Sequence, residues 1–141
     1  MELIWSNTEA MRIETNKCYS EIEGIQDFYA AQNSIYGIAD ALCFGDYQVD
    51  AISFRQENKT LSVRLVGFCS EFVFNGATKT KAFFVFDFFN VEDVNIDVAP
   101  EYWLSDIFIQ KTADGRYLFW CDGTDVNFVY EHAKVNRWWG E

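Results

Sequence analysis

The residues of this chain that could do chemistry are a single histidine, four cysteines and many carboxylates. His132 stands between Glu131 and Ala133 without a patterned nucleophile or carboxylate partner, so we assign it no catalytic role. The cysteines are widely spaced and form no Cys-x-x-Cys pair, which favours reduced thiols over a zinc site; they are Cys18, Cys43, Cys69 and Cys121. Phosphate-cradling glycine loops and common hydrolase motifs are absent. The sequence therefore predicts a non-enzyme without cofactor or metal, while an enzyme that uses carboxylates alone or with a metal stays open.

Carboxylates dominate the charge of the chain, because 22 Asp and Glu face 11 Lys and Arg and give a net charge of −11. Two stretches hold six acids each and no base, one between Lys17 and Arg55 and one between Lys81 and Lys111. Such a field repels nucleic acid and anionic membrane surfaces, and it speeds the capture of a basic partner. We therefore expect a basic protein partner, no nucleic acid and no membrane. The alternative is that acidity only keeps an aromatic-rich chain soluble.

The second acid-only stretch carries the candidate partner-binding surface. Asp93 and Asp97 fall on one face of a predicted strand, and Trp103 lies among acids as an aromatic binding hot spot would. Two alternatives stay open: the acids are the solvated face of a half-buried strand, and Trp103 belongs to the core. The predicted site consists of Asp87, Glu92, Asp93, Asp97, Glu101, Trp103 and Asp106.

The elements that position these residues form one domain over residues 1–141, with a helical start at 1–45 and antiparallel β-structure at 46–141. The Ser20-x-x-Glu23 spacing of a capping box predicts a helix that begins at Ser20, and residues 33–42 favour a second short helix. Period-two alternation then predicts strands at 49–55, 61–65, 71–74, 82–89, 94–98, 104–110, 116–121, 126–130 and 135–139. The expected class is α+β: one or two short N-terminal helices before a mainly antiparallel sheet or sandwich of about seven to eight strands.

The amino-terminal residues and the longest apolar run bear on location. Met1 to Trp5 show no basic region followed by an apolar run, and residues 82–86 are too few to cross a bilayer. We therefore expect a cytoplasmic protein. Edge strands with exposed aromatics also leave a homodimer open.

A family pattern extends over most of residues 44–130. It consists of Phe44-Gly45-Asp46-Tyr47, the alternating strands at 52–54 and 61–65, Phe86-Asp87, Ile107 and Tyr117-x-Phe119-x-Cys121. This pattern resembles the immunity proteins of bacterial polymorphic toxin systems, in particular the immunity protein 50 family, although Gly45 stands where that family tends to have histidine. The resemblance implies a cytoplasmic protein that binds a cognate toxin domain and neutralises it without catalytic residues of its own.

A second function stays open beside the resemblance. Five phenylalanines between residues 83 and 89 could line a cavity in a curved sheet and make the chain a carrier of small apolar ligands; they are Phe83, Phe84, Phe86, Phe88 and Phe89. A filled interior would argue against this function.

Overall fold

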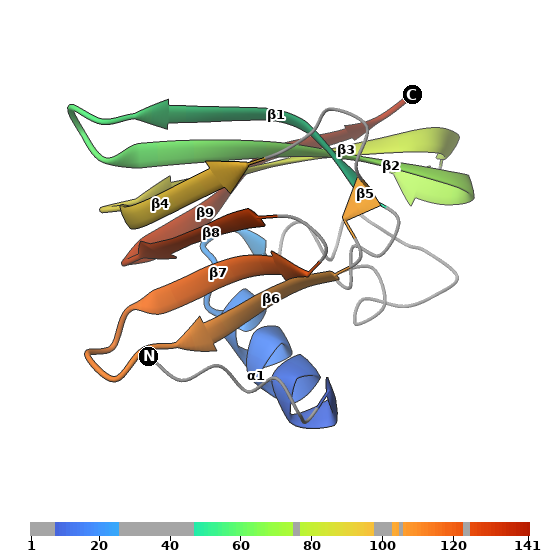
Figure 1. Cartoon of the computed structure of the whole chain (residues 1–141). Coiled ribbons are helices and arrows are strands. Elements are labelled where there is room, and N and C mark those ends of the chain that lie inside the picture. The colour runs from blue at the N-terminus through green and yellow to red at the C-terminus, as the bar shows by residue number, and fades with distance from the viewer. Residues whose placement is uncertain (1–7, 26–46, 75–76, 98–102, 105, 123–124) are drawn as a thin grey trace.

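The computed structural model describes residues 8–25, 47–74, 77–97, 103–104, 106–122 and 125–141 (Figure 1). These residues form one helix and nine strands: α1 (Thr8–Ser20), β1 (Tyr47–Arg55), β2 (Thr60–Phe74), β3 (Ala77–Phe89), β4 (Glu92–Asp97), β5 (Trp103–Leu104), β6 (Asp106–Lys111), β7 (Tyr117–Asp122), β8 (Asp125–Tyr130) and β9 (His132–Gly140). All strand pairs are antiparallel, in a first sheet of order β5-β1-β2-β3-β9 and a second of order β4-β8-β7-β6. The predicted α+β class is confirmed.

The first sheet follows the alternation of the sequence closely. β1 and β2 flank the turn at 56–59, and β3 is a central strand between β2 and β9, as predicted. The strand predicted at 71–74 is instead the end of β2, which continues past a register shift between Phe68 and Phe72. The separate strand was predicted because the alternation was clear only at residues 61–65 and Asn75-Gly76 ended the next short run.

The core lies between the two sheets and is built largely from aromatic rings. Phe88 of β3 is 1% exposed, and its ring meets those of Phe119, Phe128 and Tyr130 at centroid distances between 4.9 and 5.3 Å. All three contacts are edge-to-face, the geometry that the aromatic quadrupole favours. These rings join β3 of the first sheet to β7 and β8 of the second.

The helix differs from the prediction. It ends at Ser20, where the capping-box spacing predicted a helix to begin. The Ser20 hydroxyl donates to the carbonyl of Lys17 (2.6 Å), and the amide of Glu23 donates to the carbonyl of Ala133 in β9 (3.0 Å). The prediction was wrong because the edge of β9, which lies more than a hundred residues away in the chain, supplies the partner that a local cap would have supplied. The second predicted helix, at 33–42, lies outside the described residues.

α1 packs along β6 and hydrogen-bonds to its outer edge (Figure 1). The hydroxyl of Thr15 accepts from the amide of Ile109 (3.2 Å) and donates to the carbonyl of the same residue (3.4 Å). The carboxylate of Glu14 accepts from the amide of Lys111 (3.3 Å). Edge strands otherwise present unpaired amides and carbonyls that recruit other chains. α1 therefore closes the β6 edge.

The residues after α1 close the outer edge of β9 in the same way. The amide of Glu23 donates to the carbonyl of Ala133 (3.0 Å), and its carbonyl accepts from the amide of Val135 (2.8 Å). Gly24 follows with φ +82°, a left-handed conformation that glycine adopts at little cost. Two of the four sheet edges are thus hydrogen-bonded by the segment that contains α1.

Candidate partner-binding surface

Charge is divided between the two sheets. The strands of the first sheet carry six bases and three acids: Arg55, Arg64, Lys79, Lys81, Lys134 and Arg137 against Asp50, Glu71 and Asp87. The strands of the second sheet carry six acids and one base: Glu92, Asp93, Asp97, Asp106, Asp122 and Asp125 against Lys111. The negative field of the strands is therefore centred on the second sheet.

The register of the second sheet aligns one aspartate from each strand. Asp97 of β4 pairs with Asp125 of β8, and Asp106 of β6 pairs with Asp122 of β7. The described β7–β8 pairs end at Trp120 opposite Asn127, and the same register extended by two residues puts Asp122 level with Asp125. We call these four residues the aspartate row. Figure 1 shows the ends of β4 and β7 and the beginnings of β6 and β8 at the same end of the sheet.

The aspartate row crosses the whole sheet on one face. Residues directly opposite one another on neighbouring strands share a face, so the register puts positions 97 and 125 on one face, and likewise positions 106 and 122. With strands spaced about 4.8 Å apart, the row spans roughly 14 Å from β4 to β6. The row therefore brings four acidic positions level with one another across the sheet. Like charges directly opposite one another destabilise strand pairs.

Two residues of the predicted site belong to the row, and the sequence reasoning missed the other two. Asp97 and Asp106 lie on opposite edges of the sheet and are joined only through β8 and β7. Asp122 and Asp125 were missed because they flank Gly123 and Thr124, where a turn already explains a polar residue. Their symmetric position at the two ends of a hairpin was the available signal, since such residues face each other across the sheet.

The acids at the start of β4 differ in their availability to a partner. Glu92 lies 3.3 Å from the ammonium of Lys59 and 2.8 Å from the guanidinium of Arg116. Hydrogen bonds from Arg116 and then Lys59 hold the pKa of Glu92 below its ordinary value, so its charge is present but balanced by two cations. Asp93 is exposed, with φ +53° at a register shift of β4. Asp93 therefore offers more uncompensated charge than Glu92.

Asp87 lies away from the aspartate row. It is 8% exposed, and its two carboxylate oxygens accept from the hydroxyl of Ser62 (2.6 Å) and from the side-chain amide of Asn136 (2.7 Å). Its neighbours Phe86 and Phe88 are core residues, so alternation puts Asp87 on the opposite face of β3. Asp87 ties β2, β3 and β9 together, and we leave it out of the candidate surface.

The remaining predicted residues are only partly placed. Trp103 pairs with Gln48 at the edge of the first sheet. It precedes Asp106 by three residues, so their Cα atoms lie within about 11 Å of each other. Glu101 lies outside the described residues. Trp103 therefore stays a candidate near the β6 end of the row.

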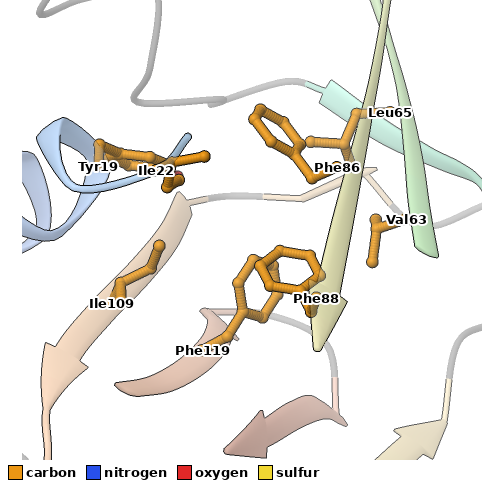
Figure 2. Close-up of a pocket in the computed structure, with 8 residues that line it drawn as sticks. All are labelled: Tyr19, Ile22, Val63, Leu65, Phe86, Phe88, Ile109 and Phe119. Carbon is orange, nitrogen blue, oxygen red and sulfur yellow. The ribbon is translucent and has the colours of Figure 1, made fainter. Parts of the chain in front are cut away.

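The phenylalanines of β3 divide between the two faces of the first sheet. Phe86 and Phe88 line a cavity of about 10 Å³ between the sheets, together with apolar side chains such as Tyr19 and Ile109 (Figure 2). This volume holds about one water molecule at most. Phe83 lies on the other face and stacks on Trp139 (4.8 Å). Among the described residues the five phenylalanines therefore do not line one cavity, and the space beside Phe86 and Phe88 is too small for an apolar ligand.

Buried titratable groups surround the end of α1. Cys18 is 3% exposed; burial, and then the charges of Glu14 and Glu21, raises its pKa to about 12. Burial also raises the pKa of Tyr117 to about 12, and the Tyr117 hydroxyl donates to Glu21. Burial holds the pKa of Tyr130 well above its ordinary value. These shifts favour the neutral thiol and phenols, which are poor nucleophiles, so this cluster is suited to packing.

Other groups that could do chemistry are isolated in the described structure. The His132 side chain is 52% exposed, with its Nε2 3.9 Å from a carboxylate oxygen of Glu23. Among the residues that the structure describes, no three His, Cys, Asp or Glu side chains are grouped to hold a metal ion. Within those same ranges no helix has the length and apolar character needed to span a membrane.

Comparison with known proteins adds no relative to this description. The chain matches no protein-family model, no curated protein and no solved structure. The likeness to immunity proteins therefore rests on the residues that carry it, and the candidate surface rests on the register of the second sheet.

Proposed function

We propose that this chain is a binding protein that captures a basic protein domain through the aspartate row. With the resemblance to immunity proteins, the proposed partner is a bacterial toxin domain, which the chain neutralises by covering its surface. The observation that carries the proposal is the alignment of one aspartate from every strand of the second sheet. A requirement for solubility alone favours mixed charges spread over the surface, and it does not account for a row of one sign.

The opposite charges of the two sheets support a directional capture. A basic partner is attracted to the second sheet, while Lys134 and Arg137 on the first sheet repel it. These two cations lie over the rings of Phe89 (5.8 Å) and Trp139 (4.6 Å). Their positive charge is therefore held by aromatic rings, which do not cancel it as a carboxylate would. Steering of this kind accelerates association and weakens as salt rises.

The test compares two variants of equal charge. Asp122→Asn with Asp125→Asn neutralises the middle of the row, whereas Glu57→Gln with Glu131→Gln removes two exposed carboxylates elsewhere. Parent and variants are used as bait in native cells at low salt, and any captured basic domain is produced alone to measure its toxicity and its association rate. We expect the parent to restore growth, and the row variant to associate about tenfold more slowly than the control variant.

Two results would contradict the proposal. One is that both variants slow association equally, since net charge and not the row would then be responsible. The other is a captured domain whose toxicity the parent leaves unchanged. The row variant should also unfold at the same or higher denaturant concentration than the parent, because it removes repulsion between facing carboxylates. A destabilised row variant would show that these carboxylates are paired within the chain.

A further inference from the structure

We infer that β4 is the docking edge, where an extended segment of the basic partner adds as a further strand of the second sheet. The basic charge of the partner rests on the proposed function. The mode of binding is inferred from the difference between the sheet edges, since some are closed by hydrogen bonds and β4, among the described residues, is not. Strand addition to an exposed edge gives affinity through main-chain hydrogen bonds and specificity through alternate side chains.

The described residues close two sheet edges with their own hydrogen bonds and leave the outer edge of β4 open at Asn95 and Ile96. Thr15 and Glu14 bond to the β6 edge, and Glu23 bonds to the β9 edge. Within the described structure, Asn95, Ile96 and Asp97 pair with β8 on one side, and Asn95 and Ile96 make no hydrogen bond on their other side. The register shift between Glu92 and Asn95 blunts only the first part of the strand, so Asn95–Asp97 remain regular.

An exposed isoleucine on β4 indicates what an added strand would cover. Ile96 pairs with Val126, which is 1% exposed in the core, yet Ile96 itself is 38% exposed because the sheet ends beside it. A residue opposite Ile96 on an added strand would have its Cβ roughly 5 Å away and would extend the core. An apolar residue is therefore favoured at that position of the partner.

The neighbouring position selects a basic residue. Asp97 is the first member of the aspartate row, so a strand added to β4 places one of its own residues level with the four backbone positions of the row. Lysine or arginine there pairs with Asp97 across the strands. Because Ile96 and Asp97 are adjacent and alternate between faces, the occupant is an extended segment that alternates apolar and basic residues.

β1 is the competing edge, and its chemistry fits a basic segment less well. Among the described residues, 51–55 also have no neighbouring strand on the side of β5 beyond its two pairs, and Phe54 is 39% exposed. This edge ends in Arg55, however, and Asp50 is already bonded to Arg64 (2.5 Å). Because Phe54 and Ile96 have similar exposed fractions, a substitution of Phe54 is a matched control for a substitution of Ile96.

The experiment uses the whole chain and a synthetic peptide of alternating lysine and valine, about as long as the six residues of β4. A second peptide carries N-methyl groups on the residues that would donate to β4, and a third replaces lysine by glutamate. Binding is followed by the anisotropy of labelled peptide, and exchange of backbone amides by NMR. We expect slowed exchange at Asn95–Asp97, and N-methylation should weaken binding about tenfold, as for two or three lost hydrogen bonds. Ile96→Ser should weaken binding about fivefold, whereas Phe54→Ser should leave it unchanged.

The remaining outcomes of the peptide experiment refute different parts of the inference. If N-methylated and parent peptides bind equally, or if the slowed amides belong to β1, strand addition at β4 is refuted while charge-based capture stands. If the glutamate peptide binds as well as the lysine peptide, strand addition stands and the proposed preference for a basic partner is refuted. If no peptide binds at low salt, strand addition at β4 is refuted, while the capture of a folded basic domain is decided separately by the row variant.

Discussion

Replacing Thr15 by valine tests whether α1 stabilises the fold by closing the β6 edge. Valine has nearly the shape of threonine, so the change removes a hydroxyl and leaves the packing of a side chain that is 5% exposed. It takes one bond from the amide of Ile109 (3.2 Å) and one from its carbonyl (3.4 Å). A buried donor or acceptor without a partner costs about 1–3 kcal/mol. Because water can reach a sheet edge in part, we expect a loss of about 2–4 kcal/mol for the two groups together.

The loss is measured by denaturant unfolding followed by circular dichroism. For a chain of this length, 1 kcal/mol corresponds to about 3–4 °C in Tm, so we expect a decrease of about 6–15 °C. Thr60→Val is the matched control, since Thr60 donates only to the exposed carbonyl of Asn58 (3.4 Å), and it should change stability by less than about 0.5 kcal/mol. If Thr15→Val is as stable as the control, the helix is held by apolar packing alone and the edge-closing argument fails. An unchanged denaturant slope would exclude a change in the unfolded state.

Two further predictions concern buried polar groups. Asp87→Ala leaves the hydroxyl of Ser62 and the amide of Asn136 without their acceptor, so we expect a loss of about 2–3 kcal/mol in chemical unfolding; a variant as stable as the parent would contradict the bracing role of Asp87. Cys18, with its pKa raised from 9.0 to about 12, should resist alkylation at pH 8 unless the chain unfolds. Because the unfolded thiol loses its proton first, stability should fall as pH rises from about 9 towards 12, and Cys18→Ala should lessen that fall in unfolding curves measured across this range. Rapid alkylation of the folded chain would contradict the burial.

Local patterns were sufficient to predict most strands, because alternation and turn residues act within a few positions. The hairpin around Asp114-Gly115 illustrates this: Gly115 has φ +87°, its amide donates to the carbonyl of Thr112 (3.1 Å), and Lys111 pairs with Tyr117 on either side. Each of those contacts joins residues close in sequence. The same local logic predicted a helix start at Ser20 and was wrong, because the decisive partner of Glu23 was a distant strand.

The aspartate row could not be predicted, because it depends on which strands become neighbours. Asp97 and Asp106 are nine positions apart in sequence, yet in space they are separated by β8 and β7, which come later in the chain. Only the pairing of Asp97 with Asp125, and of Asp106 with Asp122, brings the four together. The sequence showed that the region is acidic, but it could not show which acidic residues become aligned across the strands.

The two sheets manage their charges by different means, and this difference is the strongest argument that the row serves recognition. On the first sheet, Asp87 has both of its oxygens occupied by neighbouring side chains, and Arg137 lies over the ring of Trp139. These two charges each lie beside a group that interacts favourably with them. On the second sheet, the register pairs acidic positions across the strands, Asp97 with Asp125 and Asp106 with Asp122. Like charges directly opposite one another lower stability, so stability does not account for this arrangement. We propose that a cationic partner, which is attracted to such a row, accounts for it.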